Sequence, residues 1–183
     1  MSVPGVGYSM RKVARKALSG TDLVVDRNLD LKAIRSLDRI GFHPFRWPKF
    51  LDAYHAWYRH SLKQCSMAYV APGGFGLPVR KYFEVPAAGC LLLVKPCLGF
   101  AEIGFVDGVN CIVAEPGNLR EVAEKVAASQ DLNTIAARGR NLIRTSHSTE
   151  ARADQIRAMM NSVDSNRFVK SVWRTGKLEV VGR

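Results

Sequence analysis

The sequence contains no apolar run that approaches the ~20 residues needed to span a bilayer, so we expect no transmembrane segment. Residues 1–20 lack the apolar centre of a secretory signal. The chain has four cysteines, and their spacing is not that of metal ligands (Cys65, Cys90, Cys97 and Cys111). The sequence also has no Asp-x-Asp motif. We therefore expect buried free thiols, no metal and no resident cofactor, in a protein of the cytoplasm or the periphery of a membrane.

Acidic residues are scarce in the first part of the chain. Residues 1–100 hold 15 Lys+Arg against 6 Asp+Glu, a balance of +9, whereas residues 101–183 hold 12 against 10, a balance of +2. No acid precedes Asp22, and we predict that residues 1–20 form a basic, flexible arm. Such an excess favours an anionic partner, whether nucleic acid, a membrane surface or a phosphorylated small molecule. Charge alone does not separate these partners from a solvated basic surface.

The stretch at residues 68–94 is predicted to organise the fold. Residues 66–71 form a short apolar run typical of a strand, and a helix is expected to begin at Pro78 and to end at Gly89. Residues 90–94 are unbroken apolar sequence, which a strand covered on both faces requires. Because strands alternate with helical segments, we expect an α/β protein with a Rossmann-like parallel sheet and flanking helices.

A glycine-rich loop joins the first of these strands to the helix, with Gly73, Gly74 and Gly76. Parallel sheets bind ligands at the carboxyl ends of their strands, and this loop follows such an end. A flexible loop that runs into a helix N-terminus presents free N–H groups, and the helix dipole favours negative charge there. The sequence therefore predicts a phosphate site at residues 73–84.

Apolar periodicity and capping signals predict the remaining elements. Strands are expected at residues 21–26 and 110–114, and helices at residues 29–40 and 49–63. Three further helices should begin at a capping box formed by Asn118 and Glu121, at Asp131, and at Ser148 or Thr149. The last helix is predicted to turn Ile156, Met159 or Met160, and Val163 inward. Residues 166–183 form either a loose tail or a hairpin.

Four segments together resemble a known family: Lys81-Tyr-Phe-Glu84-Val-Pro-Ala-Ala-Gly89, Asp107-Gly-Val-Asn110, Asn118-Leu-Arg-Glu121 and Ala137-Arg-Gly139-Arg. Their order and spacing are similar to the C-terminal half of the group-one glycosyltransferases, in the branch of spore-maturation glycosyltransferase-like proteins. The resemblance implies a single GT-B half-domain, which we place at residues 21–165. It also implies a nucleotide-sugar as donor substrate and an acceptor that the sequence does not identify.

The resemblance further implies roles for individual residues. Glu84 would hydrogen-bond the donor ribose, and the two cations beside it, Arg80 and Lys81, would offset the diphosphate charge during catalysis. The loop would face the donor phosphate and sugar, which gives a donor-binding set of Gly73, Gly74, Phe75, Gly76, Leu77 and Glu84. Many relatives carry a second glutamate eight positions before the ribose one, where this sequence has Gly76.

Two alternatives stay open from the sequence. The family's N-terminal, acceptor-binding domain has no counterpart in residues 1–48, so the chain is expected to need a separate domain or subunit, or to be an inactive nucleotide-binding module. A basic nucleic-acid-binding protein is the third interpretation, although we do not expect nucleic acid as a partner. The match of Arg80, Lys81 and Glu84 to the family's pattern favours the transferase interpretation.

Overall fold

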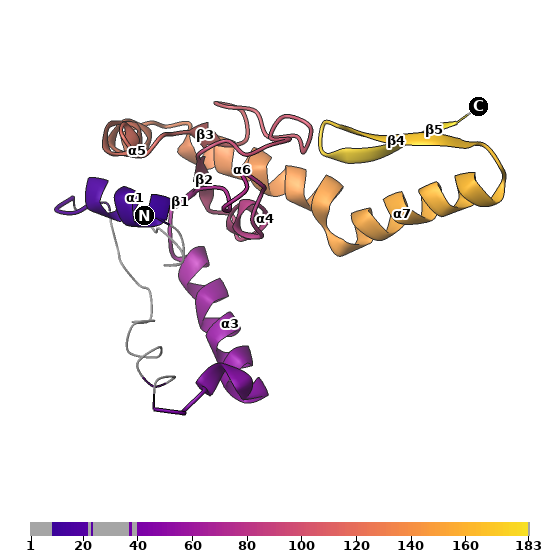
Figure 1. Cartoon of the computed structure of the whole chain (residues 1–183). Coiled ribbons are helices and arrows are strands. Elements are labelled where there is room, and N and C mark those ends of the chain that lie inside the picture. The colour runs from indigo at the N-terminus through magenta and orange to yellow at the C-terminus, as the bar shows by residue number, and fades with distance from the viewer. Residues whose placement is uncertain (1–8, 22, 24–36, 38–39, 183) are drawn as a thin grey trace.

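The computed structural model describes residues 9–21, 23, 37 and 40–182 (Figure 1). The predicted strand at residues 21–26 and the predicted helix at residues 29–40 lie almost wholly outside the described residues. The described elements are, in order, α1 (Ser9–Ala17), η1 (Pro44–Arg46), α3 (Pro48–Lys63), β1 (Met67–Val70), α4 (Lys81–Ala87), β2 (Leu91–Val94), β3 (Ile112–Val113), α5 (Leu119–Ala127), α6 (Leu132–Leu142), η2 (Ile143–His147), α7 (Thr149–Asp164), β4 (Phe168–Arg174) and β5 (Lys177–Gly182).

A parallel sheet in the order β1-β2-β3 forms the centre of the domain. Met67 pairs with Leu91 at one end of the β1–β2 ladder, and Val70 pairs with Val94 at the other. The third strand is shorter and aligns Ile112 with Leu93. The three strands lie within the segments in which the sequence predicts strands, because each is a short apolar run bounded by polar or turn residues.

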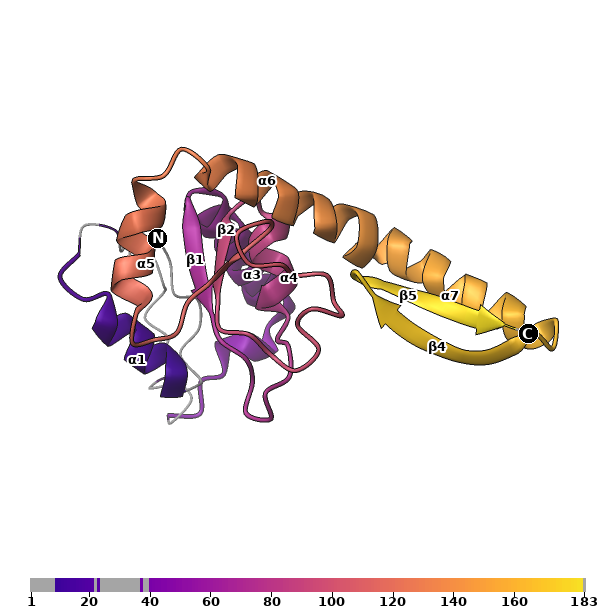
Figure 2. The same cartoon turned by 90° about the horizontal axis from the view of Figure 1, so that it is seen from above.

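The sheet is buried on both faces, as its apolar sequence requires. Alternate strand residues such as Tyr69 and Leu93 pack with α1, α5 and α6 in one cluster. Their neighbours, such as Leu92 and Val94, pack with α3 and α4 in a second cluster. Helices therefore cover each face of a parallel sheet (Figure 2), which confirms the predicted α/β, Rossmann-like half-domain.

The N-terminal segment corrects one expectation. The sequence predicts a flexible arm at residues 1–20, of which residues 1–8 lie outside the described residues. Residues 9–17 instead form helix α1, and Ala14 and Leu18 are fully buried in the core cluster shared with α5. The Arg120 side chain of α5 donates hydrogen bonds to the Ala17 and Ser19 carbonyl oxygens at 3.2 and 2.8 Å. Burial of these apolar side chains binds the segment to the domain, although its outer face is basic.

The C-terminal part of the chain extends away from the sheet (Figure 2). Helix α6 continues through the π-helical turn η2 into α7, and the hairpin β4–β5 lies beside α7. The tail is thus a hairpin, one of the two forms that the sequence left open. The prediction that Ile156, Met159 or Met160, and Val163 turn inward is wrong for Ile156, Met160 and Val163, which are exposed, whereas Met159 is half-buried. No residue of α7 is fully buried.

A polar junction holds this extension to the domain. The His147 Nε2 atom lies 2.8 Å from the Ile103 carbonyl oxygen, which can only accept, so Nε2 carries the proton and Nδ1 accepts from Arg152. The Arg152 guanidinium stacks on the Trp173 ring of β4, 4.2 Å from its centroid. At the hairpin tip, the Gly176 N–H donates to the Glu102 carbonyl oxygen at 2.9 Å.

Helix α6 approaches the loop before β3 so closely that only glycine fits. A Cβ atom at Gly139 would lie 2.6 Å from the Asn110 carbonyl oxygen. The buried Asn110 side chain fixes that loop, because its Oδ1 accepts from the Val106 N–H and its Nδ2 donates to the Gly104 carbonyl oxygen, both at 2.9 Å.

We predict that Gly139→Ala destabilises the protein by about 1–3 kcal/mol despite the better helix propensity of alanine, because helix and loop must separate. Thermal unfolding should show a melting temperature lower by roughly 3–10 °C. The matched control is Gly117→Ala, since a Cβ there meets nothing within 4 Å. An unchanged melting temperature for Gly139→Ala would contradict the close contact.

We also predict a pH dependence of stability from His147. Burial lowers the pKa of His147 below its ordinary value near 6.5, the bond to Ile103 opposes this, and the Arg152 charge lowers it further. The unfolded chain therefore binds the proton more readily, so the free energy of unfolding should fall as the pH drops below 6.5. Denaturant titrations from pH 7.5 to 5.5 should show a steeper loss for the wild type than for His147→Gln. An equal loss of unfolding free energy in the two proteins would contradict the lowered pKa of His147.

Candidate functional site

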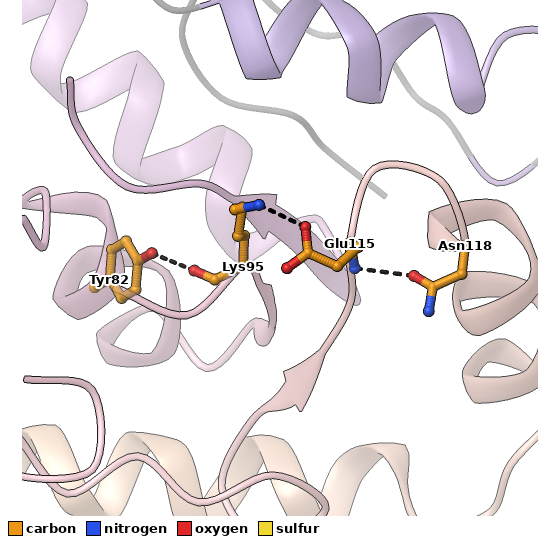
Figure 3. Close-up of polar contacts among 4 residues, drawn as sticks. All are labelled: Tyr82, Lys95, Glu115 and Asn118. Atoms are coloured by element: carbon orange, nitrogen blue, oxygen red, sulfur yellow. Dashed lines mark hydrogen bonds and ion pairs between the residues drawn. The ribbon is translucent and has the colours of Figure 1, made fainter. Parts of the chain in front are cut away.

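The carboxyl edge of the sheet gathers polar groups from the ends of β2 and β3 and from helix α4. Lys95 follows β2 and Glu115 follows β3, and the Lys95 Nζ and Glu115 Oε2 atoms form an ion pair at 2.6 Å (Figure 3). The Tyr82 hydroxyl of α4 donates to the Lys95 carbonyl oxygen. The pair therefore ties the ends of β2 and β3 together beside the glycine-rich loop that follows β1.

Asn118 contributes to the same edge in a way that the sequence did not predict. It occupies the N-cap position of α5, but its side chain makes no capping bond to the helix. Its Oδ1 instead accepts from the Glu115 N–H at 2.9 Å and so holds the Glu115 backbone (Figure 3). The predicted capping box is thus wrong, because the Asn118 side chain does not accept a hydrogen bond from the first turn of α5. Asp131 likewise makes no side-chain cap, whereas Ser148 accepts from the Ala151 N–H as predicted.

The glycine-rich loop is a closed turn. The Gly73 N–H donates to the Leu77 carbonyl oxygen and the Gly76 N–H donates to that of Gly73, both at 3.0 Å. Gly76 has a φ of +72°, which favours glycine. These bonds occupy two of the amides expected for phosphate, and the Gly74 and Phe75 amides donate no backbone hydrogen bond to the described residues. The Phe75 ring at the tip is 89% exposed.

Helix α4 presents Arg80 and Glu84 together on one side. It begins at Lys81 rather than at Pro78, and Gly89 ends it with a φ of +82°. The Arg80 Nε atom lies 2.6 Å from the Glu84 Oε1 atom, and the Arg80 side chain is 71% exposed. The second carboxylate oxygen, Oε2, is buried and has no hydrogen-bond partner in the described structure. A buried acceptor without a partner is costly, and it marks a position for a hydroxyl or amide donor.

Arg80 and Glu84 line a cavity of about 490 Å³ between α3 and α4. From α3, the cavity is lined by three basic side chains at intervals of four residues, His55, Arg59 and Lys63. Tyr58 and Leu62 of α3 line it as well, together with Ala87 at the end of α4 and Ala88, its C-cap. Glu84 is the one carboxylate among the described lining residues, so the cavity combines several cations with a single hydrogen-bond acceptor of negative charge.

The structure separates some of the predicted site residues. Lys81 does not line the cavity, although its Nζ atom lies 4.0 Å from the centroid of the Tyr58 ring, which does. The loop residues 73–77 do not line it either. The predicted set therefore divides into a loop at the strand ends and the pair of Arg80 and Glu84 at the cavity.

Sequence reasoning missed the α3 cations and the ion pair at the strand ends. The signal for the first was the spacing of His55, Arg59 and Lys63, which places them on one helix face. The signal for the second was simpler, because Lys95 is the first polar residue after a buried parallel strand. The spacing of the α3 residues was overlooked because the aromatic residues of α3 suggested core packing. The position of Lys95 was overlooked because it belongs to no sequence motif.

The cysteine thiols are not placed for nucleophilic chemistry. Burial raises the pKa of Cys111 to about 12, the Asp107 carboxylate raises it further, and a hydrogen bond with Val106 opposes this. Burial likewise raises the pKa of Cys90. Both thiols stay protonated near pH 7. Cys65, Cys90 and Cys111 are buried free thiols, as the sequence predicts.

Two kinds of feature are absent from the described residues. No group of three or more His, Cys, Asp or Glu side chains in this part of the chain is arranged to hold a metal ion. No described helix has the length and apolar character that crossing a membrane requires.

Comparisons with known proteins identify the domain. A family model described as glycosyl transferase-like matches residues 26–158, which is most of the chain. The match contains the whole parallel sheet, the glycine-rich loop, α3 and α4, and it ends within α7. A search of curated proteins finds no significant match.

Proposed function

Because the chain belongs to the glycosyl transferase-like family, we propose that it binds a nucleotide-sugar and contributes to the transfer of its glycosyl group to an acceptor. We propose further that it represents the donor-binding half of a group-one GT-B enzyme, in the spore-maturation glycosyltransferase-like branch. The observation that carries the proposal is the position of Glu84 in the cavity between α3 and α4, with one carboxylate oxygen lacking a partner.

Glu84 is suited to a ribose. Two vicinal hydroxyl groups are donors that a carboxylate can accept through its two oxygens, with charge-assisted bonds. In the structure Oε1 is held by Arg80, whose side chain is largely exposed. An entering diphosphate attracts Arg80 away from the carboxylate and leaves both oxygens for the ribose. This exchange replaces one charge-assisted contact of the carboxylate with others, and the Arg80 side chain, which is 71% exposed, is free to move toward the diphosphate.

The cations around the cavity are suited to the diphosphate. Arg59 and Lys63 of α3 and Arg80 of α4 surround a space of about 490 Å³, a volume typical of small-molecule sites. Catalysis in this proposal comes from stabilising the charge that develops on the departing diphosphate. Lys81 contributes at longer range from its position on Tyr58.

The glycine-rich loop would face the sugar end of the donor. The Gly74 and Phe75 amides are its available donors, whereas Gly73 and Gly76 maintain the turn. Leu77 and Phe75 offer exposed apolar surface for the sugar or the acceptor. The second candidate function, nucleotide binding without transfer, is favoured by Gly76, which stands where many relatives have a second glutamate.

We predict that a uridine or guanosine diphosphate raises the melting temperature and that Glu84→Gln weakens this binding by at least ~10-fold, because bonds to a charged acceptor are lost. Titration calorimetry should give the dissociation constants. Glu121→Gln on the exposed face of α5 is the matched control and should bind as the wild type does. The proposal fails when no nucleoside diphosphate or nucleotide-sugar shifts the melting temperature, or when both variants bind equally well.

The same titrations separate ribose contacts from phosphate contacts. Arg59→Ala and Lys63→Ala should weaken the binding of a nucleoside diphosphate more than the binding of the corresponding nucleoside. The difference between the two effects should become smaller at high salt. Lys125→Ala on α5 serves as the control for loss of one positive charge. Equal effects on the binding of nucleoside and of nucleoside diphosphate would show that α3 does not contact the phosphates.

A further inference from the structure

We propose that residues 40–51, the tip, dock the protein reversibly on an anionic lipid bilayer. The tip comprises the turn before η1, η1 itself and the first residues of α3. It lies at the end of α3 that is farthest from the sheet (Figure 1). Four large apolar side chains are exposed on it: Ile40 (77%), Phe42, Trp47 (53%) and Leu51. This inference does not depend on donor binding.

The tip is a formed structure. The Phe45 ring packs edge-on against Phe50 and Tyr54, each with centroids 5.3 Å apart, and Pro44 is buried beneath them. Phe42 and Trp47 contact each other edge-on at 4.8 Å on the outside. Inner aromatic rings therefore fix the backbone, and the outer apolar side chains are presented without a large loss of conformational entropy on binding.

The charges of the tip are all of one sign. Arg46 and Lys49 are exposed between the apolar side chains, and no acidic residue occurs in residues 40–51. The rest of α3 adds Arg59 and Lys63 against one acid, Asp52, and residues 1–100 as a whole carry a balance of +9. A surface of this kind is complementary to the negative potential of anionic headgroups, which attracts each nearby Lys or Arg.

The residue types favour a bilayer over a protein partner. Tryptophan and phenylalanine beside Arg and Lys are the combination found where a helix or loop lies in the headgroup region. Protein interfaces are instead depleted in lysine at their centre, and here the exposed Lys49 separates Trp47 from Leu51 in the sequence. Four apolar side chains and a few cations give reversible binding rather than stable insertion.

The test is flotation of the full chain with phosphatidylcholine vesicles that contain or lack about a third of phosphatidylglycerol. We expect co-flotation with the anionic vesicles at 50 mM salt and little with phosphatidylcholine alone. The double variant Arg46→Glu/Lys49→Glu should lower the partition coefficient at least ~10-fold. The control Lys125→Glu/Lys177→Glu makes the same charge change on other exposed surfaces and should retain most of the binding.

A second pair tests the apolar contribution. Trp47→Ser/Leu51→Ser should abolish flotation even at low salt, whereas Leu98→Ser/Val106→Ser, which alters exposed apolar residues of another loop, should not. Melting temperatures within a few degrees of the wild type confirm that each variant folds. Failure of the wild type to float, or equal loss in tip and control variants, overturns the proposal. A dimer in light scattering that only the tip variants dissociate, without flotation, assigns the tip to a second copy and also overturns it.

Discussion

Burial of the central strand on both faces is the constraint on which the rest of the structure depends. Each residue of β2 is buried, with Leu91 and Leu93 toward the helices of one layer and Leu92 and Val94 toward the other. A slip of one residue would exchange the two sets, so the register of the parallel ladder is strongly determined. The chain becomes polar immediately after this strand, and Lys95 must therefore leave the core at the carboxyl edge.

The same burial positions the cavity residues through the period of helix α4. Tyr82 and Val85 face the sheet and are fully buried. Residues that are offset from them on the helix, Arg80 and Glu84, must then face away from the sheet, toward α3. Tyr82 also bonds to the Lys95 backbone, so α4 is fixed to the strand end as well as to the sheet. The orientation of Glu84 thus follows from the packing of Tyr82 and Val85 against the sheet, which involves no residue of the cavity.

The sequence predicts those features that a single segment encodes. The apolar runs predict the three strands of the parallel sheet, and the break at Gly89 is visible because only a residue tolerant of positive φ ends this helix. It does not predict features that arise between segments. Asn118 has the pattern of a helix cap, yet a nearer donor, the Glu115 N–H, takes its side-chain oxygen. The cavity was also hidden, since it requires α3 and α4 to be adjacent in space.

The C-terminal extension shows why a family boundary is not a structural boundary. The family match ends at residue 158, but the junction that holds the extension includes residues from both sides of that point. His147 and Gln155 lie within the match, and Gln155 accepts from the Leu178 N–H of β5 beyond it. A Cβ at Gly104 would meet the backbone of Gly176 at 2.9 Å, so hairpin and domain are in direct backbone contact. These contacts join the tip of the hairpin to the domain, although the family match ends before the hairpin begins.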